Sequence, residues 1–322
     1  MTAQQLGLLF HWEFYVRISF VSISCAIVLQ TMSTVAAAGQ TNTLAFQLDD
    51  NLIRVPVVLD GHKTQAVLDS GTNTLAVNRK FALSLGMRPG NTKGTVAGGG
   101  AADSVYPVTI AQLDFGPERL TDLTGIAVDL EHVSSLARFP VDVFLGRPAF
   151  EKRALRIDYP RRQITFFPPG AVAACADPIA LHFAGGVPIV SVALQPTSSS
   201  APATLHMIVD LGSTHWAAIV GGPFLDTAEG KALKKRGVQM RLATRVGGAL
   251  EGVSVRVARM VLGTHTFSNV TVGLASHVKA FQDGSVDGSL GVPLWDKGAI
   301  TLDDSHHRLC LDLPASSGTK IK

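Results

Sequence analysis

The sequence predicts a mainly β protein of two lobes related by a pseudo-twofold axis, and three observations support this prediction. The chain has 322 residues, enough for two domains, and its charged content of 16% with 31 glycines suits short strands and turns. An Asp-x-Gly-hydroxyl motif occurs at residues 69–72 and again at 210–213. An 18-residue block at 141–158 recurs at 286–303.

The repeated block reads VDVFLGRPAFEKRALRID in the first copy and VDGSLGVPLWDKGAITLD in the second. The two blocks start 145 residues apart, and the aspartates of the two short motifs lie 141 residues apart. A weaker echo pairs Val55-Pro56-Val57-Val58 with Val187-Pro188-Ile189-Val190. Solenoid units span only about 20–50 residues, so this spacing indicates a duplicated domain.

The first lobe is expected at residues 43–167, where short apolar runs alternate with turn signals. The dipeptide Asp60-Gly61 predicts a hairpin turn, and Gly86 predicts the end of a short helix over 79–85. Strands are expected near 43–50, 52–59, 63–68, 75–77, 108–115, 120–128, 141–145, 154–158 and 163–167.

A linker rich in proline, glycine and alanine is expected at 168–178, followed by the second lobe at 179–314 and a tail at 315–322. The second lobe repeats the terminal hairpin of the first, with strands expected at 299–303 and 308–313. The basic stretch KALKKRGVQMRLATR is expected to be the solvated face of a helix or loop.

The N-terminus, residues 1–38, reads as a signal peptide or a retained signal anchor. Residues 18–38 are uncharged over 21 positions, which is long enough to span a bilayer, and they end in three alanines suited to cleavage. We therefore expect an exported protein, periplasmic or secreted, with a membrane anchor left open.

The cysteines outside residues 1–38 are Cys175 and Cys310, and they form either one disulfide or two buried free thiols.

Composition narrows the classes of partner and cofactor. A formal net charge of +3 is too small to suggest nucleic acid binding. No Cys/His spacing is typical of a zinc site, and no glycine-rich nucleotide motif follows a predicted strand. We expect neither a metal nor a cofactor.

The candidate catalytic residues are Asp69 and Asp210, because a pseudo-twofold axis would bring the two turns together. Two adjacent carboxylates cannot both ionise, so such a pair shares one proton. The ionised member can take a proton from a water, while the protonated member polarises a substrate carbonyl. This pairing predicts hydrolysis of amides without a metal.

The residues that flank each aspartate suit this chemistry. Gly71 and Gly212 allow the backbone to turn tightly and approach its partner. The hydroxyls of Thr72 and Ser213 are expected to donate hydrogen bonds that orient the adjacent carboxylates.

On these residues the chain resembles the two-lobed aspartic proteases of the pepsin and retropepsin superfamily, over roughly residues 43–314. Asp69-Ser70-Gly71-Thr72 matches the family's Asp-Ser/Thr-Gly-Ser/Thr motif. Phe144-Leu145-Gly146 and Leu290-Gly291 resemble its hydrophobic-hydrophobic-Gly signature. The resemblance implies two acid-protease β-barrel lobes with a cleft between them, and the length and export signal look like those of the bacterial members.

The resemblance also implies a flap hairpin over the cleft. By position the candidate is the segment 91–106, with Gly98, Gly99, Gly100 and Tyr106 as its residues. The alternatives are an ordinary surface loop and a tyrosine buried in a strand.

One departure from the family concerns the residue after each aspartate. In the family, hydroxyls at these two positions bond across the lobe interface. Ser70 keeps this hydroxyl, but Leu211 has none, so we expect an asymmetric interface in which Ser70 finds backbone partners.

The function implied by the resemblance is an aspartic endopeptidase that hydrolyses extended polypeptides by a water activated between the two aspartates, acting as a monomer. The alternative is a catalytically weakened acid-protease fold that serves as a peptide- or protein-binding module. The feature that favours this alternative is Leu211, which has no hydroxyl. A two-lobed receptor for a small molecule is a third class, but it has no need of paired Asp turns.

Overall fold

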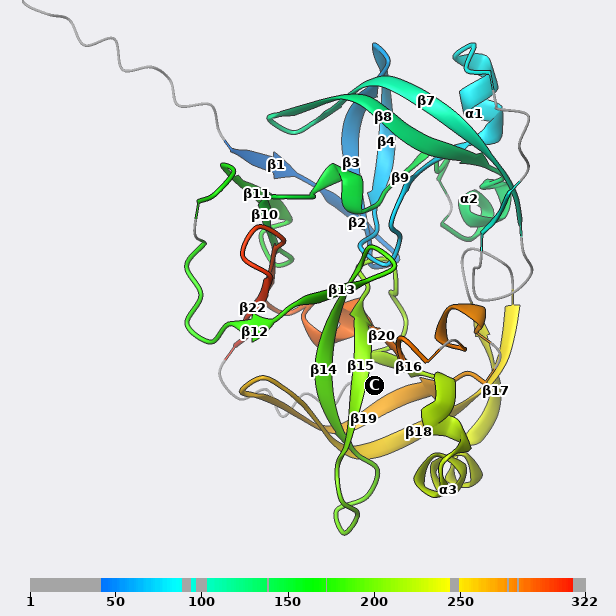
Figure 1. Ribbon diagram of the computed structural model, residues 1–322, viewed down its shortest axis with the longest axis vertical. Coiled ribbons are helices and arrows are strands. Elements are labelled where there is room, and N and C mark those ends of the chain that lie inside the picture. The colour runs from blue at the N-terminus through cyan, green and yellow to red at the C-terminus, as the bar shows by residue number, and fades with distance from the viewer. Residues whose placement is uncertain are drawn as a thin grey trace, which may run out of the picture. The chain divides into compact units, whose positions relative to one another are not determined.

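The computed structural model describes residues 42–88, 94–96, 103–137, 139–171, 173–243, 249–276, 278–282 and 284–314. The expected signal segment 1–38 and tail 315–322 lie outside these residues. The described strands form two eight-stranded sheets and one six-stranded sheet, which makes the protein mainly β as predicted (Figure 1). Within the described residues, no helix reaches the length and apolarity that crossing a membrane requires.

The first eight-stranded sheet and its helices form what we call the N-lobe. Strand β3 pairs with β7 in addition to its neighbours, and this pairing closes the sheet into a barrel. In hydrogen-bonded order the strands are β2 (Gln47–Asp49), β3 (Leu52–Leu59), β4 (His62–Leu68), β9 (Val143–Leu145), β5 (Leu75–Asn78), β8 (Glu118–Val128), β7 (Asp103–Phe115) and β6 (Gly94–Val96). The helices are α1 (Arg79–Ser84), α2 (Glu131–Ala137) and the short η1 (Arg147–Ala149).

The second eight-stranded sheet, in what we call the C-lobe, has the same order of equivalent strands and is closed by β14 pairing with β18. Its strands are β13 (His182–Ala184), β14 (Val187–Gln195), β15 (Ala203–Val209), β20 (Gly288–Leu290), β16 (Ala218–Val220), β19 (His265–Leu274), β18 (Ala249–Leu262) and β17 (Val238–Ala243). Its helices are η2 (Gly222–Asp226), α3 (Ala228–Arg236), η3 (Lys279–Phe281) and η4 (Val292–Leu294). The matching strand orders confirm two related halves.

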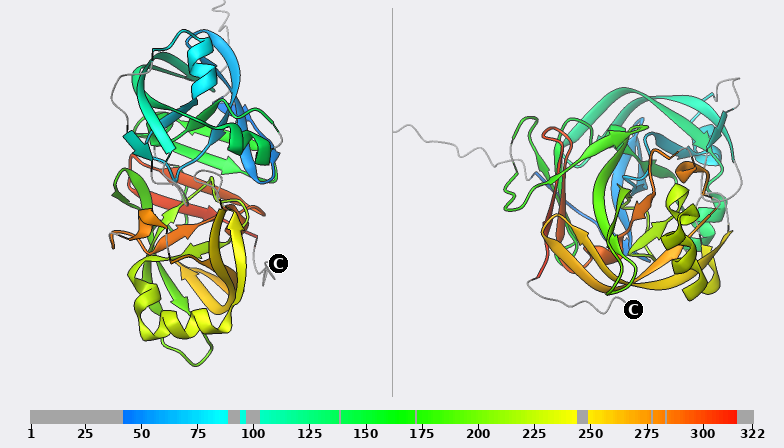
Figure 2. Two further views of the ribbon diagram at one scale, coloured as in Figure 1. Left: turned by 90° about the vertical axis from the view of Figure 1, so that its right-hand side faces the viewer. Right: turned by 60° about the horizontal axis from the view of Figure 1, so that its bottom comes forward.

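The six-stranded sheet joins the lobes. Its order is β1 (Thr43–Ala45), β11 (Gln163–Phe167), β10 (Ala154–Asp158), β21 (Ala299–Asp303), β22 (Arg308–Asp312) and β12 (Ile179–Ala180). At its centre β10 runs antiparallel to β21, and Arg156 lies opposite Thr301, its equivalent in the repeated block. The pseudo-twofold axis therefore passes between these two residues, and Figure 2 shows the β21–β22 hairpin between the strands of the two lobes.

The period-two pattern of burial explains why the sequence forms these barrels. In β3 the side chains of Ile53, Val55 and Leu59 are fully buried, whereas Pro56 between them is exposed. The hairpin turn at Asp60-Gly61 has positive φ at both residues, as a two-residue turn between twisted strands requires. Helix α1 ends as predicted before Gly86, whose φ is +73°.

Two local features differ from the predicted elements. Helix α2 is absent from the predicted elements, because seven residues are too short to show a helical period. Its start is fixed by Asp129, whose carboxylate accepts a hydrogen bond from the Glu131 amide at 3.0 Å. The described part of the basic stretch, residues 231–243, divides between the end of α3 and strand β17, and most of its residues up to 240 are exposed as predicted.

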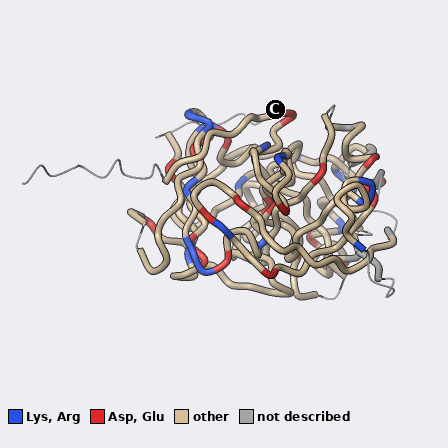
Figure 3. The backbone as a smooth tube through the Cα atoms, turned by 90° about the horizontal axis from the view of Figure 1, so that it is seen from above, with Lys and Arg blue, Asp and Glu red and all other residues tan. Residues whose placement is uncertain are grey.

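Basic and acidic positions are interspersed along the described chain in the view of Figure 3.

Arg147 of the N-lobe forms an ion pair with Asp304 in the β21–β22 turn, at 3.2 Å, and its guanidinium lies 4.0 Å from the ring centroid of Phe183. The Asp304 carboxylate, almost fully buried, also accepts a hydrogen bond from the Lys152 amide at 2.6 Å. These contacts attach the β21–β22 turn to the segment that follows β9 of the N-lobe.

The sequence left two alternatives for Cys175 and Cys310, and the structure supports the disulfide. The two sulfur atoms are bonded at 2.07 Å across a sequence separation of 135 residues. The bond attaches the expected linker segment to strand β22.

Candidate active site

Both aspartates are held at the ends of buried strands. Asp69 follows β4 and its amide donates to the carbonyl of Leu145 at 3.0 Å, while the Asp210 amide donates to the carbonyl of Leu290 at 3.0 Å. The residues just before each aspartate are almost fully buried, so each turn starts from a fixed point in a core. Strands β9 and β20, from the repeated blocks, thus support one aspartate each.

The two aspartate turns meet across the lobe boundary. A Cβ atom placed on Gly71 would lie 2.7 Å from Cγ of Asp210, and one placed on Gly212 would lie 2.7 Å from Cγ of Asp69. Real side chains do not approach this closely, so only glycine fits at either position. The two carboxyl groups are hydrogen-bonded to each other. The structure therefore brings the predicted pair together.

Backbone amides, rather than hydroxyls, orient the carboxylates. The Gly71 amide donates to Oδ1 of Asp69 at 2.9 Å, and the amides of Gly212 and Ser213 donate to Oδ1 of Asp210 at 2.9 and 3.1 Å. Within the described residues, no hydrogen bond joins the hydroxyl of Thr72 or of Ser213 to either carboxylate, so that expectation is wrong.

The reason is that both side chains are turned toward the strands behind the turn. A Cβ placed on Gly146 would meet the methyl carbon of Thr72 at 2.8 Å, and one on Gly291 would meet Oγ of Ser213 at 2.9 Å. The glycines of the repeated blocks therefore make room for the residues that follow the aspartates.

The two aspartates differ in their affinity for a proton. Burial raises the pKa of Asp69 to about 6, although the hydrogen bonds from the Gly71 amide and from Asp210 act in the opposite direction. Burial, followed by the charge of Asp69, raises the pKa of Asp210 well above its usual range. Both aspartates are half-buried as whole residues. Two adjacent carboxyl groups whose pKa values are both raised share one proton between them.

Ser70 holds the two turns together from one side. Its hydroxyl donates to the carbonyl of Val209 at 2.6 Å and accepts a hydrogen bond from the Leu211 amide at 3.0 Å. Ser70 and Leu211 are both fully buried. The predicted asymmetry is confirmed: the hydroxyl bonds across the boundary to backbone atoms, and the Leu211 side chain returns no such bond.

A cavity of about 530 Å³ opens at Asp69. Its remaining lining is mostly apolar and comes from both lobes: Gly71, Thr72, Asn73, Thr74, Ala76, Ile126, Val128, Leu130, Phe144, Ala184, Gly185, Val187, Ile208, Ala280, Ser285 and Val286. Sequence reasoning named Gly71 and Thr72 but missed the apolar wall residues, because an apolar residue at the end of a strand looks the same whether it faces a core or a cleft.

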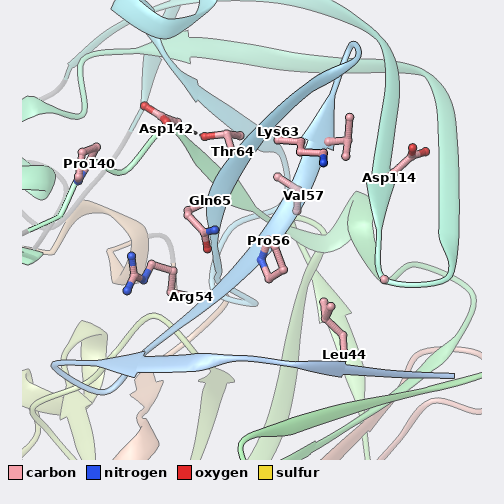
Figure 4. Close-up of a pocket in the computed structure, with 12 residues that line it drawn as sticks. Leu44, Arg54, Pro56, Val57, Lys63, Thr64, Gln65, Asp114, Pro140 and Asp142 are labelled. Carbon is pink, nitrogen blue, oxygen red and sulfur yellow. Dashed lines mark hydrogen bonds between the residues drawn. The ribbon is translucent and has the colours of Figure 1, made fainter. Parts of the chain in front are cut away.

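A larger cavity, of about 680 Å³, lies on the outer face of β3 and β4, bordered by residues such as Pro56, Lys63 and Gln65 (Figure 4). It contains neither aspartate. Part of its polar lining is already paired, since Thr64 donates to Asp142 at 2.6 Å. We therefore place the candidate active site at the smaller cavity, where the acid–base groups are.

The flap candidates are only partly described. Gly98, Gly99 and Gly100 lie outside the described residues. Strand β6 pairs antiparallel with the start of β7, which is the arrangement of a hairpin. Tyr106, in β7, is half-buried, lies opposite Ala127 of β8 and does not line the 530 Å³ cavity.

Comparison with known proteins bears on the fold. Residues 55–149 match the family model described as aspartyl protease. A solved structure, the aspartic proteinase from Irpex lacteus, superimposes with a TM-score of 0.50 at 12% sequence identity, over 87% of this chain and 98% of that chain. The fold is that of an aspartic proteinase.

The aspartic proteinase fold is thus established for both lobes, whereas the family match covers one of them. The matched residues include Asp69 and end before Asp210, so for the second half the likeness rests on the topology and the repeat and concerns the fold alone. No curated protein sequence matches the chain significantly. Among the described residues, no group of three or more His, Cys, Asp or Glu side chains is arranged to hold a metal ion.

Proposed function

We propose that this protein is an aspartic endopeptidase whose catalytic residues are Asp69 and Asp210. The observation that carries the proposal is the reciprocal packing of the dyad, in which each carboxyl group lies against the glycine of the opposite turn. Such packing has no evident structural benefit, because burying two hydrogen-bonded carboxyl groups disfavours their ionisation.

In the proposed mechanism the shared proton starts on Asp210, whose pKa is raised by burial and by the charge of Asp69. Ionised Asp69 accepts a proton from a water molecule, whose oxygen attacks the carbonyl carbon of the scissile peptide bond. Asp210 donates its proton to the carbonyl oxygen, which gives a neutral tetrahedral diol. In the second step Asp69 returns its proton to the leaving nitrogen, the C–N bond breaks, and Asp210 recovers a proton from a hydroxyl of the diol. The dyad ends in its starting state.

We infer that the substrate is an extended polypeptide with an apolar side chain beside the bond that is cut. The walls supplied by Ile126, Val128 and Phe144 support this choice, because they would remove apolar surface from water as the side chain enters. The opposite wall includes Val187 and Val286 of the C-lobe.

We also infer that the protein works outside the cytoplasm, with the N-terminal segment as signal peptide or anchor. The Cys175–Cys310 disulfide supports this inference, since such bonds persist in oxidising compartments. One chain supplies both aspartates, so we propose that it acts as a monomer.

The test is cleavage of an unfolded protein by the wild type and by Asp69→Asn and Asp210→Asn. Each substitution preserves the size of the side chain but removes acid–base chemistry, so we expect kcat to fall by roughly 10²–10⁴-fold. Asp122→Asn is the control, because Asp122 is exposed on β8 and has no part in the site. Cleavage that persists in both dyad variants would refute the assignment. A wild type that binds peptides without cutting them would support the binding module.

A further inference from the structure

Two short turns reach across the lobe boundary and contact the aspartate loops. The first joins β2 to β3 and consists of Asp50 and Asn51, with φ of +50° and +62°. The second joins β13 to β14 and consists of Gly185 and Gly186, with φ of +55° and +85°. The two sheets have the same strand order, so these turns are equivalent features of the two lobes.

Each turn contacts the residue four places after the aspartate of the other lobe. The side-chain amide of Asn51 donates to the carbonyl of Thr214 at 3.0 Å. The side-chain amide of Asn73 donates to the carbonyl of Gly185 at 2.7 Å. Thr214 follows Asp210 as Asn73 follows Asp69, so the two hydrogen bonds join equivalent turns and loops, although the turn supplies the donor in the first and the acceptor in the second.

Packing around both contacts is close. A Cβ on Gly186 would lie 3.0 Å from Cβ of Asn73, so the glycine turn lies directly against the first aspartate loop. At the second loop Thr214 is buried, and its neighbour His215 places Nε2 3.5 Å from the carboxylate of Asp50. Each aspartate loop is thus held by its own lobe on one side and by the opposite turn on the other.

These contacts matter because only one of the two aspartate turns carries a hydroxyl that bonds across the lobe boundary. Ser70 bonds across the boundary, but Leu211 adds no second hydroxyl. We propose that Asn51 and Asn73 are positioning residues, which hold the two aspartate turns in register across the lobe boundary in place of the hydroxyl that Leu211 lacks. Neither residue takes part in proton transfer. The kinetic part of this inference rests on the proposed endopeptidase function.

Asn51→Gly is the decisive substitution, because it removes the donor amide, adds no charge and accepts a positive φ. The matched control is Asn269→Gly. Asn269 also has a positive φ, of +55°, and its exposed side chain has no hydrogen bond within the described residues. We expect Asn51→Gly to lower kcat by about tenfold, with KM nearly unchanged, because the dyad loses register while the cavity keeps its walls. The control should keep the wild-type kcat.

A rescue experiment distinguishes a role of Asn51 in positioning the aspartate turns from a general effect of Asn51 on stability. Leu211→Thr supplies the missing hydroxyl, so in that background Asn51→Gly should lower kcat by less than about threefold. Asn73→Ala should likewise lower kcat less in the Leu211→Thr background, and its KM is left out of the comparison because Asn73 also lines the cavity. An equal loss of kcat with and without Leu211→Thr, or no loss at all, would overturn the proposal.

Hydrogen exchange provides a readout that is independent of cleavage. Asn51→Gly should accelerate exchange of the amides at residues 211–216, and Asn269→Gly should not. If the wild type does not cleave but this difference is present, the proposed endopeptidase function fails while the positioning role stands. Unchanged exchange in Asn51→Gly refutes the positioning role, including in the case where Leu211→Thr does not fold.

Discussion

At the scale of single residues, the two aspartates are equivalent in position and unequal in surroundings. Oδ1 of Asp69 accepts one amide hydrogen bond from its own turn, and Oδ1 of Asp210 accepts two. The charge of Asp69 nevertheless adds to the effect of burial in raising the pKa of Asp210. In the proposed mechanism we therefore assign Asp69 as the base and Asp210 as the acid of the first step.

The assignment of Asp69 as base and Asp210 as acid predicts how cleavage depends on pH. Asp69 must be ionised to accept a proton, and its raised pKa is about 6, so we expect kcat/KM to rise with pH through about 6. It should fall again at higher pH, where Asp210 loses the proton that polarises the carbonyl. The measurement is kcat/KM for a short peptide between pH 4 and 9 at constant ionic strength. A rate that only declines above pH 4 would contradict this assignment of roles.

At the scale of elements, hairpin turns connect the two lobes. The β21–β22 turn supplies Asp304, whose buried carboxylate binds the Arg147 side chain and the Lys152 amide. Asp304 itself donates its amide to the carbonyl of Arg153 at 3.0 Å. The turn is thus attached to the segment that leads from β9 to β10.

Removing the Asp304 carboxylate should have a large effect on stability. Asp304→Ala leaves the Lys152 amide without its acceptor, and it leaves the half-buried Arg147 guanidinium with only the weaker ion pair to Glu151 at 3.8 Å, so we expect the free energy of unfolding to fall by about 1–3 kcal/mol. Denaturant unfolding measures the change. Asp114→Ala is the comparison, because it breaks the solvent-exposed pair with Arg119 and should leave the unfolding midpoint nearly unchanged. Equal midpoints for the two variants would contradict the role of the turn.

The sequence predicted some of these elements better than others. The strand at 52–59 and the hairpin turn at Asp60-Gly61 were predictable because period-two burial and turn chemistry are local signals, and the strand at 154–158 was predictable from the repeated block. Helix α2 was not, since its seven residues show no period. The contact between Asn51 and Thr214 spans 163 positions and depends on how the lobes pack, for which the chain has no local signal.

At the scale of the whole molecule, duplication made the fold and the dyad predictable. The repeated blocks form β9 and β10 in one lobe and β20 and β21 in the other, and these strands support the aspartates and join the lobes. Sequence symmetry cannot reveal features that exist in one copy. The disulfide is such a feature, and both alternatives for its cysteines were open until the strands were placed.

The Cys175–Cys310 bond should stabilise the folded chain without affecting the site. Replacing both cysteines with serine releases a loop of 135 residues in the unfolded state, so we expect the free energy of unfolding to fall by about 2–4 kcal/mol. Cleavage at low temperature should be unchanged, because the bond lies in the linker and β22. Thermal unfolding with and without a reductant is the measurement. A reductant that lowers the midpoint of the double serine variant as much as that of the wild type would contradict this effect.

The ladder between β10 and β21 also constrains how the protein is made. Strand β10 is synthesised 145 residues before the strand that pairs with it, as the positions of Ala154 and Ala299 show. At about 5–20 residues per second, a ribosome takes roughly 7–30 seconds to cover that distance. For this time a nascent first lobe would present an unpaired strand edge, which is the kind of surface that pairs with other chains. The same duplication that places two equivalent aspartates at one site creates an interval during synthesis in which the first half presents an edge that can pair with other chains.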